Sequence, residues 1–330
     1  MEHSIHSESE APALHDDSWH PRPELLRAMQ QIATIADGDD TAIISDRSIT
    51  FQNHAERTTI SAVPINIDTY DGLRITECIT IRTPLTTFKL FDENRYAFIN
   101  IFATTGAVVR GSDGEDAIVS RLPLFEGDDE ALADLYTPLI ADAARLQLIG
   151  PLCGADLMQD RKEQRGAAEV ALPGWDEPSY WGAHEFEGAK ERLRHNGAYA
   201  NAGPDGLTVE FPWEQGAVSA GIGDCTSLLQ IRADEPHPAA GNGLFFRLDL
   251  PLHLSEEDAQ SWAAKLNRAE AEAVDSPPFF GAWCCLPGSG TLSFAGFWPN
   301  LLYIPGTATN IAFWSWARSR FARQVIGNSS

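Results

Sequence analysis

The residues with the types and spacing for nucleophilic catalysis all fall between positions 217 and 253. Residues 217–221, Ala-Val-Ser-Ala-Gly, are similar to the serine elbow of hydrolases, with alanine in place of the first glycine. That elbow needs a buried strand before the serine and a helix after it, which together hold the hydroxyl over an oxyanion hole. Glycine-rich sequence follows Ser219, so the segment is interpreted as a loop between strands.

A thiol mechanism is the second catalytic possibility in this region. Cys225 with His237 or His253 would supply a nucleophile and its general base. A single cysteine is more often a small buried apolar residue, and the sequence alone does not place these side chains in contact. Gly221 and Gly223 lack the third glycine and the strand-to-helix setting of a dinucleotide-binding loop. We therefore predict a chain that is not an enzyme and binds no cofactor.

Metal-binding patterns are equally weak. Cys284 and Cys285 are adjacent in a predicted strand, so their side chains point to opposite faces and cannot share one ion. The acidic residues 126–130 precede a predicted helix, where carboxylates complement the helix dipole. A loose divalent site and a solvated tail are both open for the histidines of the first 20 residues, which are His3, His6, His15 and His20. We predict no metal site.

The charge balance narrows the class of partner. The 330 residues include 24 Lys and Arg against 47 Asp and Glu, which gives a formal net charge of −23 at pH 7. Such a chain repels nucleic-acid phosphates and anionic lipid headgroups, because both are bound through Lys and Arg. We predict no nucleic-acid and no membrane partner. The same charge favours solubility and a basic protein partner.

The cysteines and the absence of a long apolar run predict the cellular location of the protein. No stretch approaches the roughly 20 apolar residues needed to span a bilayer. The five cysteines are odd in number, are scattered and form no Cys-x-x-Cys pair. This pattern argues against a disulfide framework and predicts a reducing, cytoplasmic location.

The predicted helices and strands follow the same order twice along the chain. We predict a disordered tail over residues 1–20, a first module over 21–150, a linker over 151–185 and a second module over 186–330. Apolar periodicity in each module predicts a helix, three strands, a helix, a hairpin and a closing helix. The predicted fold class is α+β, with two tandem similar domains that each combine an antiparallel sheet with helices.

Individual residues support a duplication. The matched pairs are Asn94 with Asn267, Gly106 with Gly281, Pro123 with Pro299 and Arg145 with Arg320, at separations of 173, 175, 176 and 175 residues. Pro84 is matched with Pro251 at a separation of 167, a drift that loop insertions would explain.

The element order α-β-β-β-α-β-β-α resembles the bacterial module of type III secretion chaperones and the related YbjN-like proteins. The likeness rests on residues 248–252, 266–268, 280–283 and 297–300, and on 81–85, 94–95 and 121–124 in the first half. The resemblance implies a non-catalytic module that binds protein segments, here joined into a covalent pseudo-dimer. The fusion, the His-rich tail and the aromatic second half depart from the family pattern.

Aromatic residues mark the predicted partner surface. In the closing helix, residues 308–326, the stripe of Ile311, Trp314, Ala317, Phe321 and Val325 is predicted to face the core, and a second apolar stripe runs beside it. The second stripe must pack against the other half, a second copy or a client. The candidate partner-binding residues are Phe279, Phe280, Trp283, Phe313 and Trp316.

The leading functional hypothesis is therefore a chaperone-like or adapter-like protein that binds a protein segment by helix-in-groove docking or strand addition. Two alternatives stay open. One is an enzyme or small-molecule binder that uses the cleft between the halves. The other is a structural homo-oligomer.

Overall fold

The computed structural model describes residues 20–37, 43–53, 56–68, 74–86, 94–126, 176–213, 226–237, 240–273 and 278–328. Over these ranges the chain is an α+β protein in two similar halves, each built on a six-stranded antiparallel sheet. The predicted fold class is confirmed. The N-terminal tail, most of the predicted linker and the predicted helix near residues 128–149 lie outside the described residues.

The first half begins with a helix and ends with a hairpin. Its elements are α1 (Pro23–Asp37), β1 (Ile43–Ile44), β2 (Ser48–Asn53), β3 (Glu56–Asp68), β4 (Arg74–Pro84), α2 (Asn94–Ile99), the 3-10 helix η1 (Asn100–Phe102), β5 (Ala107–Arg110) and β6 (Asp116–Phe125). The strands pair in the order β1-β2-β3-β4-β6-β5.

The second half repeats this plan. Its elements are α5 (Ala183–His195), β7 (Tyr199–Gly203), β8 (Gly206–Pro212), β9 (Thr226–Arg232), β10 (Gly243–Asp249), α6 (Glu256–Glu272), β11 (Ala282–Cys285), β12 (Leu292–Pro299), the 3-10 helix η3 (Asn300–Leu302) and α7 (Thr307–Asn328). The order β7-β8-β9-β10-β12-β11 matches the first sheet strand for strand. Each half thus has one strand more than predicted, β1 or β7. Neither shows the alternation of large apolar residues by which a strand is detected.

Local sequence explains the elements that were predicted correctly. Alternate side chains of β8 and β9 are buried, as expected for strands with one face on a core. α6 begins where Ser255 Oγ accepts a hydrogen bond from the backbone N–H of Asp258 at 3.1 Å, and three acidic residues occupy its first turn.

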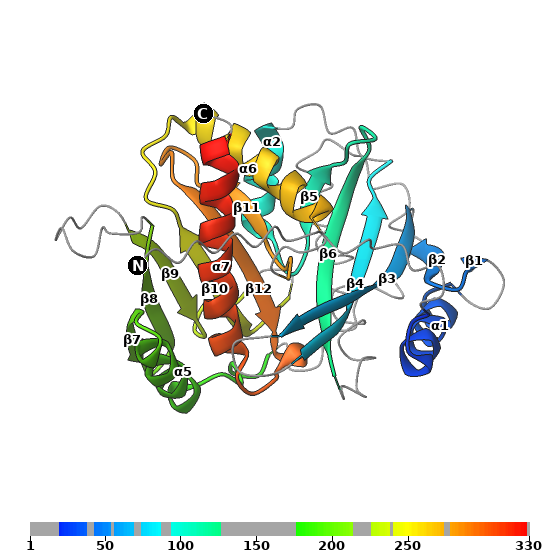
Figure 1. Ribbon diagram of the computed structural model, residues 1–330, viewed down its shortest axis with the longest axis horizontal. Helices are drawn as coiled ribbons and strands as arrows, with labels where there is room; N and C mark the ends of the chain where they lie inside the picture. Colours follow the sequence, from blue (N-terminus) through cyan, green and yellow to red (C-terminus); the bar gives the residue numbers. More distant parts are fainter. Residues whose placement is uncertain are drawn as a thin grey trace, which may run out of the picture.

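Figure 1 shows the arrangement of the helices around the two sheets. α7 lies across the second sheet, where it contacts β9 and β10, and α5 packs on β7, β8 and α7. α1 contacts β2 at the far end of the first sheet. α2 and α6, from different halves, pack against each other between the sheets. No helix of the described residues is long and apolar enough to cross a bilayer.

Strand register corrects the predicted residue matches. Val108 pairs with Ile118 in the first hairpin, as Trp283 pairs with Phe294 in the second, so Pro123 and Pro299 are indeed equivalent. Asn267, however, corresponds to Asn100 and not to Asn94. Asn100 is buried and exchanges two hydrogen bonds with Val108, its Oδ1 at 2.8 Å from the N–H and its Nδ2 at 3.0 Å from the carbonyl. Asn267 makes the same pair with Trp283, at 2.7 and 2.8 Å.

The match of Pro84 with Pro251 is also shifted. Leu85 N–H donates to Asp116 O and Leu250 N–H donates to Leu292 O, so Leu85 and Leu250 are the equivalent residues. Gly106 and Gly281 precede β5 and β11 by one residue each, which agrees with the predicted match. Gly281 has φ of +105°, and a Cβ there would lie 2.4 Å from Ala295 O, so only glycine fits.

The predicted core stripe of α7 is confirmed only in part, because Ile311 is buried while Trp314, Phe321 and Val325 pack against the core from its margin. The buried face is made of small and polar residues together with one isoleucine: Ala308, Ile311, Ala312, Ser315, Arg318, Ser319 and Ala322. Trp314, Phe321 and Val325 are only half-buried and flank this face. The large aromatic side chains therefore pack along the sides of the helix and not at the centre of its buried face.

Candidate binding surface

The predicted catalytic residues do not form a site among the described residues. Ser219, Gly221, Gly223 and Cys225 lie outside them. His253 is exposed after β10, whereas His237 is half-buried with its Nε2 3.4 Å from Phe102 O and its ring against Phe297. Over the ranges that the structure describes, no group of three His, Cys, Asp or Glu side chains could hold a metal ion. Cys284 and Cys285 are both buried free thiols.

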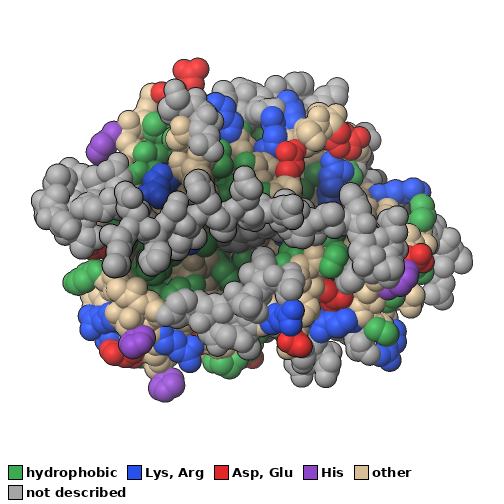
Figure 2. Space-filling model, viewed as in Figure 1, with side chains coloured by type: hydrophobic (Ala, Val, Ile, Leu, Met, Phe, Trp, Pro, Cys, Tyr) green, Lys and Arg blue, Asp and Glu red, His purple; other side chains and the backbone are tan. Residues whose placement is uncertain are grey.

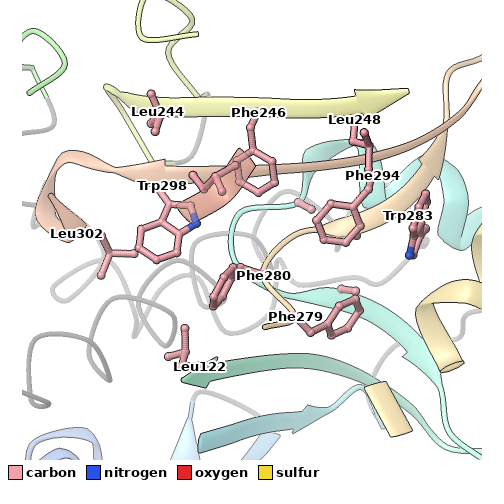
Figure 3. Close-up of a cluster of buried hydrophobic side chains, with 14 of the residues drawn as sticks. Leu122, Leu244, Phe246, Leu248, Phe279, Phe280, Trp283, Phe294, Trp298 and Leu302 are labelled. Carbon is pink, nitrogen blue, oxygen red and sulfur yellow. The ribbon is translucent and has the colours of Figure 1, made fainter. Parts of the chain in front are cut away.

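Three predicted partner-binding residues are instead buried where the two halves meet. Phe279 and Trp283 have no exposed surface and Phe280 is 2% exposed, so the prediction that they lie on the surface is wrong. Figure 3 shows Phe279 and Phe280 between Leu122 of β6 on one side and Phe294 and Trp298 of β12 on the other. We call this region, formed by the segments before β5 and β11 with strands β6 and β12, the junction.

Backbone hydrogen bonds cross the junction reciprocally. Arg121 N–H of β6 donates to Phe279 O at 3.0 Å, and Phe297 N–H of β12 donates to Thr104 O at 3.1 Å. By the hairpin register Arg121 is equivalent to Phe297, and Thr104 to Phe279. The segment before each hairpin thus continues the pairing of the other half's strand, as in a two-fold dimer.

Side chains strengthen the junction at the C-terminal end of α6. The guanidinium of Arg121, from the first half, donates to the carbonyl of Glu270 at 3.2 Å and to the carbonyl of Ala273. Arg268 Nε of α6 donates to Arg110 O at the end of β5, at 2.9 Å. A cationic group suits the position of Arg121 because the last carbonyls of a helix lack partners within the helix.

A buried ion pair lies next to this contact. Arg318 of α7 and Glu270 of α6 are almost inaccessible, and Arg318 Nε lies 3.0 and 2.9 Å from the two carboxylate oxygens. Trp283 Nε1 donates to the same carboxylate at 2.7 Å, and Arg318 Nη2 donates to Pro278 O at 2.6 Å. Burial raises the pKa of Glu270, while Arg318 and Trp283 oppose that shift. Because the charges and hydrogen bonds are matched within one chain, we interpret this cluster as structural.

The remaining two predicted partner residues are on α7. Trp316 is half-buried, and its ring is stacked on Phe211 of β8 with centroids 5.5 Å apart. Phe313 is half-buried as well. The second apolar stripe of α7 therefore packs, at least through Trp316, against its own half and not against the other half. Neither residue belongs to the exposed large hydrophobic side chains.

Exposed large hydrophobic side chains are found at three kinds of place in the described residues. Two lie on the edge strand β1, and one, Tyr199, lies on the edge strand β7. Both edges are protected against strand addition. β1 has only two residues, and on β7 Arg194 Nε donates to Ala200 O at 3.0 Å. Phe98 of α2 stands apart, and the last group is Tyr180, Tyr303 and Ile304.

We call Tyr180, Tyr303 and Ile304 the aromatic patch. Their side chains are 44%, 39% and 46% exposed although they belong to segments more than 120 residues apart. The Tyr303 ring meets Tyr180 edge to face with centroids 5.9 Å apart, and it meets the buried Trp181 at 5.2 Å. Sequence reasoning missed the patch because residues 176–182 were assigned to the linker, where a Tyr-Trp pair carries no periodicity.

A rigid frame supports the patch. Asn300 is buried and fastens the 177–180 segment to η3. Its Oδ1 accepts from Tyr180 N–H at 3.0 Å, and its Nδ2 donates to the carbonyls of Glu177 and Pro178, each at 3.1 Å. Glu185 Oε1 accepts from the N–H groups of Gly306 and Ala308 at 3.2 Å and so caps α7 directly after the patch. The exposed rings therefore lie just before the N-termini of α5 and α7, and the hydrogen bonds of Asn300 and Glu185 hold these two segments together.

The patch is locally acidic. The segments that build it, residues 176–185 and 300–308, contain Asp176, Glu177 and Glu185 and no Lys or Arg. The described residues as a whole are nearly balanced, with 19 Lys and Arg against 25 Asp and Glu, while the other residues have 5 against 22. Figure 2 agrees, since both signs are interspersed over the face that it shows. The acidity thus belongs to the two segments that build the patch and not to the described residues as a whole.

Comparison with known proteins identifies no relative that bears on function. No family model matches the chain, and no curated protein matches it. One similar solved structure is the di-domain ARO/CYC StfQ from the steffimycin biosynthetic pathway, at 13% identity over 94% of this chain and 91% of that chain. Its TM-score of 0.14 is too low to support an argument about fold or activity.

Proposed function

We propose that this chain is a non-catalytic, cytoplasmic protein-binding protein that engages its partner through the aromatic patch. The observation that carries the proposal is a group of exposed apolar side chains on a rigid support. Tyrosine and tryptophan dominate the energetics of protein interfaces, because a rigid aromatic ring buries a large area at little cost in conformational entropy. Protein-segment binding is also what the resemblance to the chaperone and YbjN-like modules implies.

The binding face differs from the one expected from sequence. Phe279, Phe280 and Trp283 are buried in the core, so a partner would have to break that core to reach them. The patch has no such cost, because Tyr180 and Tyr303 are already exposed and their backbone is already fixed. In this proposal the two halves form a covalent pseudo-dimer that acts as the scaffold, and the second half provides the contact.

A site-specific photo-cross-linking experiment tests the proposal. A photoreactive phenylalanine analogue at position 303 is compared with the same analogue at Tyr199, which is 64% exposed but stands alone on an edge strand. The partner pool is a display library of random 12-residue peptides. We expect selected peptides to cross-link at position 303 and not at position 199. Equal labelling at both positions, or none at 303, would refute the proposed binding face.

A further inference from the structure

We infer that the aromatic patch receives a cationic side chain, an arginine or lysine of a basic protein segment, with Glu177 as its counter-ion. This inference rests on the proposed function, because it names the chemistry of the partner at the same surface. Its basis is the combination of exposed rings and carboxylates at one place, and neither feature by itself would select a cation.

The ring geometry leaves room for a cation. Tyr180 and Tyr303 are nearly perpendicular, at 86°, so the edge of one ring meets the face of the other. The exposed surface that each ring retains is available to a ligand. A guanidinium or ammonium group within about 6 Å of a ring centroid is attracted by the negative face of the π-system.

Glu177 strengthens this attraction in two ways. Tyr180 Oη donates a hydrogen bond to Glu177 Oε2 at 2.6 Å, which draws electron density towards the ring and makes its face more negative. The same carboxylate, which is on an exposed residue, can accept a second hydrogen bond from an incoming cation. The bond to Glu177 also raises the pKa of Tyr180, so the phenol keeps its proton and remains the donor.

The local charge selects against other occupants. The carboxylates of the two segments, at Asp176, Glu177 and Glu185, would repel a phosphate backbone or an acidic segment. No Lys or Arg in the two segments competes for Glu177. Ile304 follows Tyr303 in the sequence, is 46% exposed and offers an apolar surface to the methylene stem, which arginine and lysine bury while their charged end stays paired.

The test begins from unbiased selection. A library of random 12-residue peptides displayed on phage is selected on the full chain and, in parallel, on a Tyr303→Ala variant. Peptides that depend on Tyr303 are then made with each arginine replaced by citrulline, which keeps the shape of the side chain and removes its charge. We expect citrulline at one position to weaken binding about 5- to 30-fold, as a desolvated cation–π contact with a counter-ion would require.

A second variant separates the carboxylate from the rings. Glu177→Gln retains a hydrogen-bond acceptor for Tyr180 but removes the charge. We expect it to weaken the arginine peptide about 3- to 10-fold and to leave the citrulline peptide unchanged. The matched control is Glu187→Gln on the exposed side of α5, which should change neither affinity.

The outcomes separate the inference from the proposed function. Peptides that depend on Tyr303 but bind equally well with citrulline, or that contain no Arg or Lys, would overturn the cationic partner and keep the binding face. No peptide that depends on Tyr303 would overturn both. Sedimentation that shows a dimer lost in Tyr303→Ala would assign the patch to a second copy and overturn the inference.

Discussion

The two halves share one backbone plan and fill it with different side chains. In both, a buried asparagine of a helical segment holds the second residue of the hairpin through two hydrogen bonds, Asn100 with Val108 and Asn267 with Trp283. At the equivalent strand positions Ile118 of the first half corresponds to Phe294, and Leu122 to Trp298. The two halves therefore share the same asparagine hydrogen bonds, but the second half has larger side chains at the equivalent strand positions.

The difference in side-chain size between the halves is greatest at the junction. Thr104 and Thr105 of the first half occupy the places that Phe279 and Phe280 occupy in the second. The first half thus contributes small side chains at the positions where the second half contributes large rings. In a fused chain the two halves can carry different residues at equivalent positions, so one half can have large side chains where the other has small ones. A homodimer of identical chains cannot do this.

The largest expected effect on stability comes from removing a buried ring from the junction. Phe280→Ala should lower the free energy of unfolding by about 3–5 kcal/mol, because a fully buried ring is replaced by a cavity. Thr105→Ala, at the equivalent position, should cost under about 1 kcal/mol, since no hydrogen-bond partner of its Oγ1 is found among the described residues. Denaturant unfolding of both variants measures the difference. Equal losses would show that the halves contribute alike.

The buried ion pair is the next test of the comparison. Arg318→Met leaves Glu270 without its counter-charge in the core of the second half, and we expect a loss of about 3 kcal/mol. The first half has a partly buried pair, Arg110 with Asp116 at 2.9 Å, whose side chains are 29% and 12% exposed. Asp116→Asn should cost less, about 1 kcal/mol, because solvent still reaches part of that pair. A smaller effect for Arg318→Met than for Asp116→Asn would contradict the assigned role of burial.

The two asparagines should behave alike despite their different surroundings. Asn100→Ala and Asn267→Ala each leave a strand N–H and carbonyl without these partners, which should cost about 2–3 kcal/mol in either half. Asn201→Ala, at an exposed position of the edge strand β7, is the control and should cost well under 1 kcal/mol. If Asn100→Ala leaves the free energy of unfolding unchanged, the asparagine hydrogen bonds stabilise only the second half.

The smallest effect on stability is expected at the aromatic patch. Tyr303→Ala removes two aromatic contacts from a partly exposed ring and should cost about 1 kcal/mol in thermal or denaturant unfolding. Its effect on peptide binding should be far greater than its effect on folding. A large loss of stability would identify Tyr303 as a core residue and weaken the proposed binding role.

Part of this organisation was predictable. The alternation in β10 and the serine cap of α6 are local patterns, which neighbouring residues in the sequence display without knowledge of the fold. The repeat was also recognised, although the Asn-Arg dipeptides at 94 and 267 suggested a match that the strand register does not support. The edge strands β1 and β7 were missed because their pairing, and not their own composition, makes them strands.

What the sequence determined by itself is the α+β class, the duplication and most strand and helix cores, because periodic burial is a short-range pattern written into neighbouring residues. Only the tertiary structure decided which aromatic side chains are buried and which are exposed. Phe280 and Tyr303 are both large and aromatic, yet one is in the junction and the other on the surface, because the contact between the halves covers the first and reaches no further.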